Sequence, residues 1–317
     1  MTALMAPLAS IVTPVLNRRE TLEACLRSVA DQTYPNIEHI VVDGGSTDGT
    51  IDLLREWEPR VKWISESDTG MYNAINKGLA MTTGDFVAYV NSDDLYLPYS
   101  VEAAVEVLTK DHDLVFGDLG VLTRERDPVG FYPQFYRDFD LNHYTHFATL
   151  AQPTVFWTRA LMERTGSFDE SYRLLGDCEY WLRAAVKGAR ITHLDEILAV
   201  QVEHEGTLRV TQPEQLQAEF ARLRADYTKH AGPPAGQRLE HPRRSVHWRY
   251  HQLLFAIAGA KSRPARWGGF MKFLDEHRVP KRPAGLAWFL LPQPLRPVNA
   301  SLVDGPALER VLFGGRN

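Results

Sequence analysis

The stretch Ser65-Glu-Ser-Asp-Thr-Gly-Met-Tyr-Asn-Ala-Ile-Asn-Lys-Gly78, followed shortly by Gly84-Asp-Phe-Val-Ala-Tyr-Val-Asn-Ser-Asp-Asp94, decides the fold. It predicts the end of a strand, a loop, a helix over 70–81, a short apolar strand over 85–90 and an acidic loop. In open α/β sheets, ligands bind where the parallel strands end. We therefore expect a ligand site at the acidic loop.

The residues before this stretch repeat the alternation of strand and helix. Continuous apolar runs over 8–13, 37–42 and 61–65 predict buried strands. Between them we expect one helix with Leu22, Cys25, Leu26 and Val29 on its apolar face and a second helix over about 50–57. Such alternation predicts an α/β fold, with a parallel sheet and helices on its faces. Farther along the chain we expect a hairpin turn near 124–130 and two late strands, over 191–194 and 197–202.

Polar side chains follow the predicted strands at the points where the strands end. They are Thr13, Asp43, Glu66, Asp68, Asp93 and Asp94. The carboxyl ends of parallel strands share one edge, so these residues should line one rim. Crowded carboxylates repel one another, which favours a cation and hydrogen-bond donors between them. A nucleotide sugar with bound Mg²⁺ or Mn²⁺ offers both, because these ions bridge phosphates to one or two protein carboxylates.

Each acidic residue also has a purely structural explanation. Asp43 with Gly44 and Gly45 is typical of a strand-to-helix turn. Asp93 and Asp94 could cap a helix N-terminus. The argument for a site rests on the pooled pattern, because unrelated turn residues have no reason to share a rim.

The composition is that of an ordinary globular protein. The chain has 317 residues, of which 44% are hydrophobic and 24% charged. Its apolar runs fall short of the roughly 18 residues that span a bilayer, and its opening residues lack the positive start of a signal peptide, so we expect a cytoplasmic protein. Two cysteines, Cys25 and Cys178, argue against a disulfide framework and a cysteine-ligated zinc site.

The charge changes sign along the chain. Residues 231–317 contain 14 Lys and Arg against 5 Asp and Glu, whereas the preceding 230 residues contain 21 against 35. The basic segment is also aromatic, which suits an anionic membrane surface. The alternative is a helical appendage that packs on the preceding domain or on a second subunit in a homodimer. A nucleic-acid partner is not expected, since no binding motif accompanies the charge.

Several motifs together make the chain recognisable. It resembles the family-2 glycosyltransferases, which have the nucleotide-sugar-binding fold called GT-A. The resemblance spans about residues 8–210, and its order and spacing are specific. The matching pieces are Ser10-Ile-Val-Thr-Pro-Val-Leu-Asn17, Val42-Asp-Gly-Gly-Ser-Thr-Asp-Gly-Thr50, the opening stretch quoted above, Gln152-Pro-Thr-Val-Phe-Trp157, Gly166-Ser-Phe-Asp169, Gly176-Asp-Cys-Glu-Tyr-Trp-Leu-Arg183 and a late His204-Glu-Gly.

The resemblance implies a GT-A catalytic domain over 1–210. Its nucleotide-binding half would cover about 1–121 and its acceptor half about 122–210. A basic, aromatic, helical C-terminal extension would follow over 211–317.

The resemblance also implies roles on the donor side. Thr13, Val15 and Asn17 would lie along the nucleotide, and Asp43 and Asp68 would accept hydrogen bonds from its base or ribose. The family's Asp-x-Asp signature falls on Asn91, Ser92 and Asp93, all expected to contact the donor. Asp93 would hold the Mn²⁺ or Mg²⁺, Asn91 would contact ribose or sugar, and His204 would be a second metal ligand or a phosphate contact.

Asp177 is the candidate general base. Relatives usually have Glu-Asp here, whereas this chain has Gly176 before Asp177. A carboxylate opposite the leaving diphosphate can take the proton of an attacking hydroxyl. Asp177 could instead simply cap the helix that follows it. Trp181 is a candidate acceptor contact, and Phe156, Trp157 and Phe168 are expected in the core.

The implied function is that of an inverting, metal-dependent hexosyltransferase. It would move a sugar from a nucleotide diphosphate, preferably a UDP-sugar, to a hydroxyl of a glycan or polyisoprenoid-linked acceptor during surface polysaccharide synthesis. It would work in the cytoplasm, or peripherally at the inner face of the cell membrane. The alternative is a catalytically inactive nucleotide-sugar-binding protein, which the departures at Asn91 and Gly176 keep open.

Overall fold

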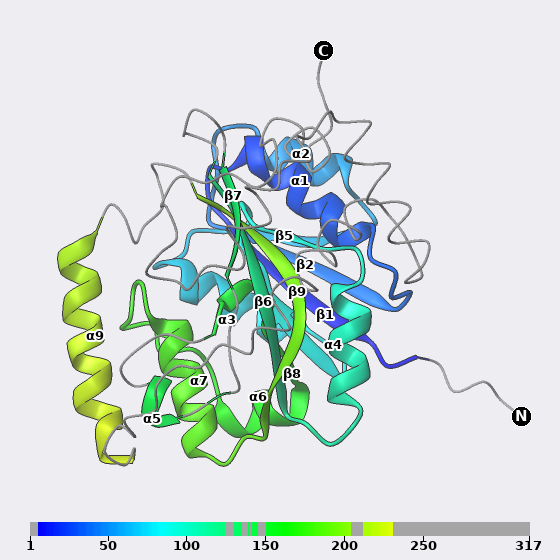
Figure 1. Cartoon of the computed structure of the whole chain (residues 1–317). Helices are drawn as coiled ribbons and strands as arrows, with labels where there is room; N and C mark the ends of the chain where they lie inside the picture. The colour runs from blue at the N-terminus through cyan, green and yellow to red at the C-terminus, as the bar shows by residue number, and fades with distance from the viewer. Residues whose placement is uncertain are drawn as a thin grey trace, which may run out of the picture.

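A computed structural model describes residues 6–123, 130–134, 139, 141–144, 150–203 and 212–230. Strands and helices alternate through the first part of the chain, as predicted (Figure 1). In order they are β1 (Ala9–Val15), α1 (Arg19–Ala30), β2 (Ile37–Asp43), α2 (Thr50–Glu56), β3 (Lys62–Ser65), α3 (Met71–Met81) and β4 (Phe86–Tyr89).

The second part of the chain completes the sheet and adds helices beside it. Its elements are β5 (Leu95–Tyr96), α4 (Ser100–Leu108), β6 (Leu114–Thr123), β7 (Gly130–Gln134), α5 (Leu141–Tyr144), η1 (Gln152–Thr154), β8 (Phe156–Thr158), α6 (Arg159–Thr165), α7 (Gly176–Val186), β9 (Ile191–Glu203), α9 (Pro213–Tyr227) and η2 (Thr228–His230). Within the described ranges, no helix is long and apolar enough to cross a membrane.

The strands form one sheet in the order β3-β2-β1-β4-β8-β6-β9-β5, with β7 beside β6. β3, β2, β1 and β4 are parallel to one another, and β8 joins β4 in the antiparallel direction. The carboxyl ends of the first four strands therefore meet at one edge, as the rim hypothesis requires. The α/β fold class is confirmed.

Two expectations for the later strands have different outcomes. The hairpin is confirmed, because β6 and β7 pair in the antiparallel direction on either side of 124–129. The two late strands, however, are one continuous strand, β9. Its parallel register against β6 shifts at Asp118. We infer that this irregularity absorbs the interruption in the apolar pattern, so that the strand need not break.

Helices cover both faces of the parallel half of the sheet. Side chains of a strand point alternately to its two faces. Val41 of β2 packs with residues of α1 and α2, whereas its neighbours Ile40 and Val42 pack with Ala74 of α3. Gly78 lets α3 lie close to β1, because a Cβ atom there would come within 2.4 Å of Val12 Cγ1.

An aromatic cluster fills the space under α7. Phe168 stacks on Tyr180 with ring centroids 4.2 Å apart, and Trp181 packs edge-on against Trp157 at 5.1 Å. The expected core positions of Phe156, Trp157 and Phe168 are confirmed. Trp181 is only 1% exposed, so its expected contact with an acceptor is wrong. Its ring packs inward from α7 and contributes to the core instead.

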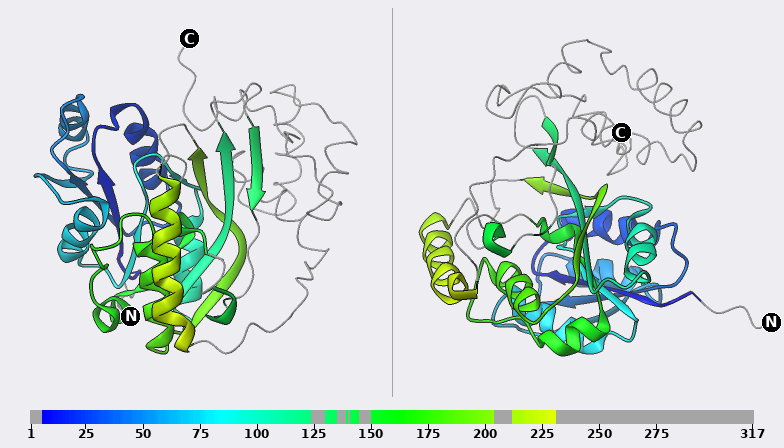
Figure 2. Two further views of the ribbon diagram at one scale, coloured as in Figure 1. Left: turned by 90° about the vertical axis from the view of Figure 1, so that its left-hand side faces the viewer. Right: turned by 60° about the horizontal axis from the view of Figure 1, so that its bottom comes forward.

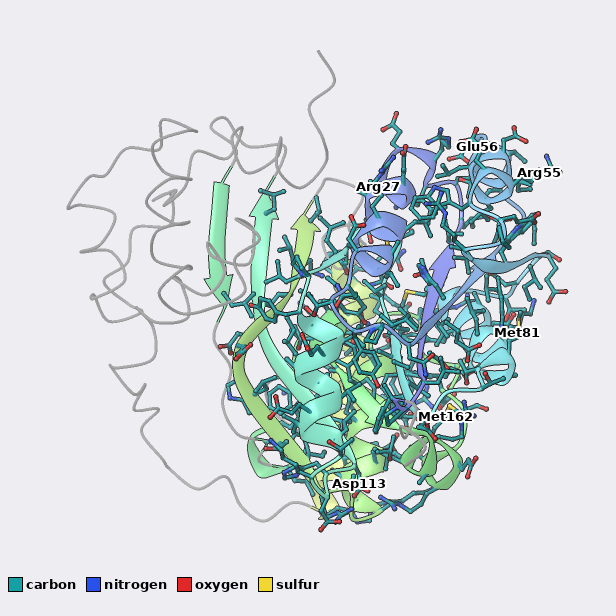
Figure 3. All side chains as sticks on the ribbon, turned by 90° about the vertical axis from the view of Figure 1, so that its right-hand side faces the viewer. Arg27, Arg55, Glu56, Met81, Asp113 and Met162 are labelled. Atoms are coloured by element: carbon teal, nitrogen blue, oxygen red, sulfur yellow. The ribbon has the colours of Figure 1, made fainter. Side chains whose placement is uncertain are left out.

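The amino-terminal edge of the sheet holds two buried carboxylates with several partners each. At the start of β6, Asp113 binds the backbone N–H and the guanidinium of Arg190. Figure 3 shows Asp113 at the end of the molecule opposite Arg27, Arg55 and Glu56 of α1 and α2. This edge is therefore built for stability, in contrast to the edge where the parallel strands end.

Glu38 is the second of these carboxylates. It lies at the start of β2 and accepts hydrogen bonds from Ser10 Oγ at 2.6 Å, Lys62 Nζ at 2.8 Å and Gly84 N at 3.1 Å, with further bonds from Thr83. Burial alone would raise its pKa, but the bonds from Lys62, Ser10 and Thr83 outweigh burial and lower the pKa to about 2.

This carboxylate predicts a loss of stability in acid. The pKa of Glu38 is lower in the folded than in the unfolded chain, so its contribution is present above about pH 4.5 and is lost as the pH falls toward 2. The contribution is at most about 3 kcal/mol. In Glu38→Gln the free energy of unfolding, measured in urea, should be lower at pH 7 and vary less between pH 4.5 and 2. Glu56→Gln, on the exposed side of α2, is the control and should behave like the parent chain.

Candidate functional site

The end of β1 turns from core to surface within a few residues. Thr13 is fully buried, and its hydroxyl lies 2.9 Å from Nε2 of His39. Burial lowers the pKa of His39 to about 3. Val15 is also buried, and its carbonyl accepts a hydrogen bond from Gly44 N. Leu16 and Asn17 are exposed. Of the three residues expected along the nucleotide, Asn17 therefore presents its side chain to solvent, while Thr13 and Val15 support it from below.

Asp43 is held rigidly at the end of β2. Its Oδ2 accepts hydrogen bonds from Gly45 N and Ser46 N, both at 3.0 Å, and from Ser65 Oγ at 2.6 Å. Its Oδ1 is buried and has no hydrogen-bond partner in the part of the chain that the structure describes. A buried carboxylate oxygen normally has a partner. The arrangement therefore presents an acceptor for a ligand O–H or N–H.

Leu16, Gly44 and Asp68 meet beside Asp43. A Cβ atom on Gly44 would lie 2.5 Å from Asp68 Oδ2 and 3.4 Å from Leu16 Cδ1. Asp68 is fixed by Gly70 N, which donates to its Oδ1 at 2.9 Å. Leu16 is 51% exposed, which is unusual for a large apolar side chain. Leu16 lies in the Ser10–Asn17 motif. Nothing in the sequence showed that it faces solvent, because an apolar residue just after a buried strand could equally be buried.

The loop after β4 lies beside the end of β1. Asn91 Nδ2 donates to Gln152 Oε1 at 3.1 Å and to Asp94 Oδ2 at 3.3 Å, while Asn91 Oδ1 is buried without a partner among the described residues. Ser92 is buried and Asp93 partly exposed. Asp94, expected on the rim, is only 1% exposed and accepts a hydrogen bond from Val202 N of β9. Asp94 therefore supports the loop from within.

The donor atoms of this loop fit a hard divalent ion. Asp93 and Asn91 offer oxygen atoms, which Mg²⁺ and Mn²⁺ prefer. The described residues contain no group of three or more His, Cys, Asp or Glu that could hold a metal by itself. A nucleotide-bound ion needs only one or two protein ligands, because phosphates and water complete its shell. His204, the other expected ligand, lies outside the described residues.

Asp177 is positioned by Tyr72 of α3. Tyr72 Oη donates to Asp177 Oδ1 and accepts from Asp177 N, each at 3.2 Å. Burial and the charge of Asp177 raise the pKa of Tyr72 well above 10, so the hydroxyl keeps its proton. Gly176 permits this contact, because a Cβ atom there would come within 2.7–2.8 Å of the Tyr72 ring. Sequence reasoning missed Tyr72, which is 105 residues from its partner.

The helix α9 packs against the segment that leads to Asp177. Its buried Glu219 accepts hydrogen bonds from the backbone N–H groups of Arg173, Leu174 and Leu175, at 2.8–2.9 Å. Burial alone would raise the pKa of Glu219, but these bonds and one from Gln215 lower it. Figure 2 shows α9 along the outside of the molecule, and Tyr227 Oη near its end donates to Glu179 of α7 at 2.6 Å.

Comparison with known proteins identifies the family. Residues 10–161 match the family model described as glycosyl transferase family 2. A PGL/p-HBAD biosynthesis glycosyltransferase of Mycobacterium bovis is 30% identical over 213 residues, which cover 65% of this chain and 80% of the relative. The chain belongs to glycosyltransferase family 2. An uncharacterized glycosyltransferase of Mycobacterium tuberculosis is 33% identical over 190 residues, which cover 57% of this chain and 70% of that protein.

Solved structures of similar proteins confirm the GT-A fold of this family-2 glycosyltransferase. The crystal structure of S. aureus TarS 1–349 in complex with UDP-GlcNAc has a TM-score of 0.54 and 18% identity, and the match covers 80% of each chain. The mannosyltransferase PcManGT of Pyrobaculum calidifontis, in complex with GDP-Man and Mn²⁺, has a TM-score of 0.52 and 20% identity. That match covers 82% of this chain and 77% of PcManGT.

The anchoring of α9 predicts a local effect of removing Glu219. In Glu219→Ala three backbone N–H groups lose their shared acceptor, and each unsatisfied group costs about 1–3 kcal/mol. Hydrogen exchange measured by NMR should show that the amides of residues 173–175 lose protection at least tenfold. Glu214→Ala, at an exposed position of the same helix, should leave these amides unchanged. Equal protection in the two variants would contradict the anchoring role.

Proposed function

We propose that the protein is an inverting glycosyltransferase that moves a sugar from a UDP-sugar to a hydroxyl of a glycan or polyisoprenoid-linked acceptor. The observation that carries this proposal is the presence of two carboxylates, each held in place by hydrogen bonds. Asp43 at the strand ends has a buried Oδ1 without a hydrogen-bond partner among the described residues, and Asp177 is fixed by Tyr72 at the start of α7. The first suits donor binding and the second suits proton transfer.

The nucleoside would lie at the ends of β1 and β2. The exposed Leu16 side chain offers an apolar contact for a planar base, while Asp43 and Asp68 accept hydrogen bonds from base or ribose. Asn17 would follow the nucleotide. UDP is the preferred nucleotide of the donor, because TarS, one of the structural neighbours, is in complex with UDP and with UDP-GlcNAc. The GDP-Man in PcManGT makes GDP the competing donor type.

Asp93 would hold a Mn²⁺ or Mg²⁺ ion, with His204 as a second ligand or phosphate contact. When bound, the ion would neutralise the negative charge on the leaving diphosphate. Asn91 and Ser92 would face the ribose or sugar, and the unpartnered Oδ1 of Asn91 is the atom available for that contact. The Mn²⁺ in PcManGT supports a divalent ion of this kind.

Asp177 would act as the general base. The acceptor oxygen attacks the anomeric carbon as its proton passes to the Asp177 carboxylate, and the bond from that carbon to the diphosphate oxygen breaks. One displacement inverts the anomeric centre. The protonated hydroxyl of Tyr72 orients the carboxylate throughout. A Cβ atom at 176 would clash with the Tyr72 ring, which gives a structural reason for glycine where relatives usually have glutamate.

The proposed cellular role follows the charge of the chain. The catalytic domain would cover 1–210, and the basic residues 231–317 of the extension would bring it to the anionic inner face of the cell membrane. There a cytoplasmic enzyme meets lipid-linked acceptors for surface polysaccharide synthesis. A homodimer formed through the same segment is the competing role. Co-sedimentation of the full chain with anionic vesicles would support the membrane role. Self-association in solution without vesicle binding would support the homodimer.

Donor binding predicts a thermal shift that depends on Asp68. UDP or a UDP-sugar with Mn²⁺ should raise the melting temperature of the full chain, since a ligand that binds the folded state stabilises it. Asp68→Asn removes a charged acceptor, so its Kd for the nucleotide should rise about tenfold or more. The control Asp52→Asn, which loses an exposed ion pair with Arg55 on α2, should bind normally. A flat response of the parent chain to UDP, GDP and their sugars would refute the donor site.

Transfer activity predicts a different effect for Asp177→Asn. This variant keeps the shape of the side chain but cannot take a proton, so turnover should fall about 10²–10⁴-fold. Nucleotide binding in the thermal assay should be unchanged. If the parent chain binds nucleotide sugars but transfers none to any acceptor in a membrane extract, the protein is the inactive binder instead.

A further inference from the structure

A cleft of about 430 Å³ lies at the start of α3, where Tyr72 is part of its lining. Three segments far apart in sequence form it: residues 69–73 at the start of α3, the loop around 170–174, and the first turn of α9. Tyr72 lines the cleft and also holds Asp177 at 3.2 Å. Tyr72 therefore connects the cleft to the proposed base, which is not itself among the described lining residues.

We infer that this cleft binds the terminal saccharide of the acceptor through its hydroxyl groups. The inference rests on the proposed function and extends it to residues of α9 that lie beyond the matched family model.

The chemistry of the lining suits a neutral sugar. Asn73, Gln212 and Gln215 are among the lining residues, and amides can both donate to and accept from a hydroxyl. The amide of Asn73 donates to Glu170 and that of Gln215 to Glu219. Met71 and Leu174 supply apolar surface for the C–H faces of a sugar ring. The volume lies within the range of small-molecule sites.

The charges of the cleft do not favour a phosphate. Its described lining contains one cation, Arg173, which already donates to the carbonyl of Thr69. It also contains the anion Glu170, which accepts hydrogen bonds from Asn73 at 3.0 Å and Asn76 at 2.9 Å. A carboxylate fixed in this way repels phosphate but accepts bonds from sugar hydroxyls.

The cleft adjoins the proposed nucleotide site at one point, because Gly70 of its lining donates its N–H to Asp68 at 2.9 Å. Its described lining begins at Thr69 and does not include Asn17, Asp43 or Asp93. A donor nucleotide at the strand ends would therefore leave it accessible. The acceptor saccharide is the ligand that must place a hydroxyl near Asp177, so we assign the cleft to the acceptor.

Saturation-transfer NMR on the full chain with saturating UDP and Mn²⁺ tests the inference. The probes are methyl β-D-glucoside, methyl α-D-mannoside, methyl α-L-rhamnoside and methyl N-acetyl-β-D-glucosaminide. At least one should receive saturation, and its signal should fall at least fivefold in Gln212→Trp, where an indole fills the cleft. Gln217→Trp, an exposed position of the same helix outside the lining, is the matched control and should keep the signal.

The nucleotide shift separates failure of this inference from failure of the proposed function. If UDP raises the melting temperature but no glycoside binds, or if Gln212→Trp keeps the glycoside signal, the acceptor cleft is refuted and the donor site stands. If Gln212→Trp weakens UDP-GlcNAc relative to UDP, the cleft holds the donor sugar and the acceptor assignment is wrong. If UDP gives no shift, the proposed function fails by itself.

Discussion

The packing of the Tyr72 ring against Gly176 is the contact on which the site depends. It joins α3, which follows the third strand of the parallel half, to α7 in the later half of the chain. Any side chain at 176 would push the ring away, because a Cβ atom there would lie 2.7–2.8 Å from it. With glycine in place, the Tyr72 hydroxyl reaches both the backbone and the carboxylate of Asp177. The missing side chain of Gly176 therefore sets the position of the proposed base, Asp177.

The strand β2 shows how the two edges of the sheet differ. Glu38 at its start accepts hydrogen bonds from Ser10, Thr83, Gly84 and Lys62, so both of its carboxylate oxygens have partners within the protein. Asp43 at its end is held by one oxygen, while the other is buried without a partner in the described structure. Leaving a buried acceptor unsatisfied costs stability, about 1–3 kcal/mol for such a group. In β2 this cost falls at the end where we propose that a ligand binds, and Glu38 at the other end avoids it.

The sequence predicted the strands and the rim because both are local patterns. Apolar runs end in acidic residues, and the parallel topology then brings Asp43 and Asp68 to the same edge. It could not predict contacts between distant segments: Tyr72 with Asp177, or Glu219 with the amides of residues 173–175, which require the packed structure. It also could not tell which way a side chain faces. Leu16 is exposed and Trp181 is buried, although an apolar residue gives the same signal in either place.

The position of α9 suggests how one fold can serve different acceptors. The family model ends at residue 161, so the strands that would bind the donor lie within it, while Asp177, Glu219 and Gln212 lie beyond it. Glu219 ties α9 to the segment before α7 by accepting hydrogen bonds from three backbone N–H groups, so the tie does not depend on the side chains of that segment. Gln212, which lines the cleft, can then change without disturbing this tie, whereas Gln215 donates to Glu219 and contributes to it. A rigid backbone anchor beside variable side chains is how a shared catalytic frame can acquire a new specificity.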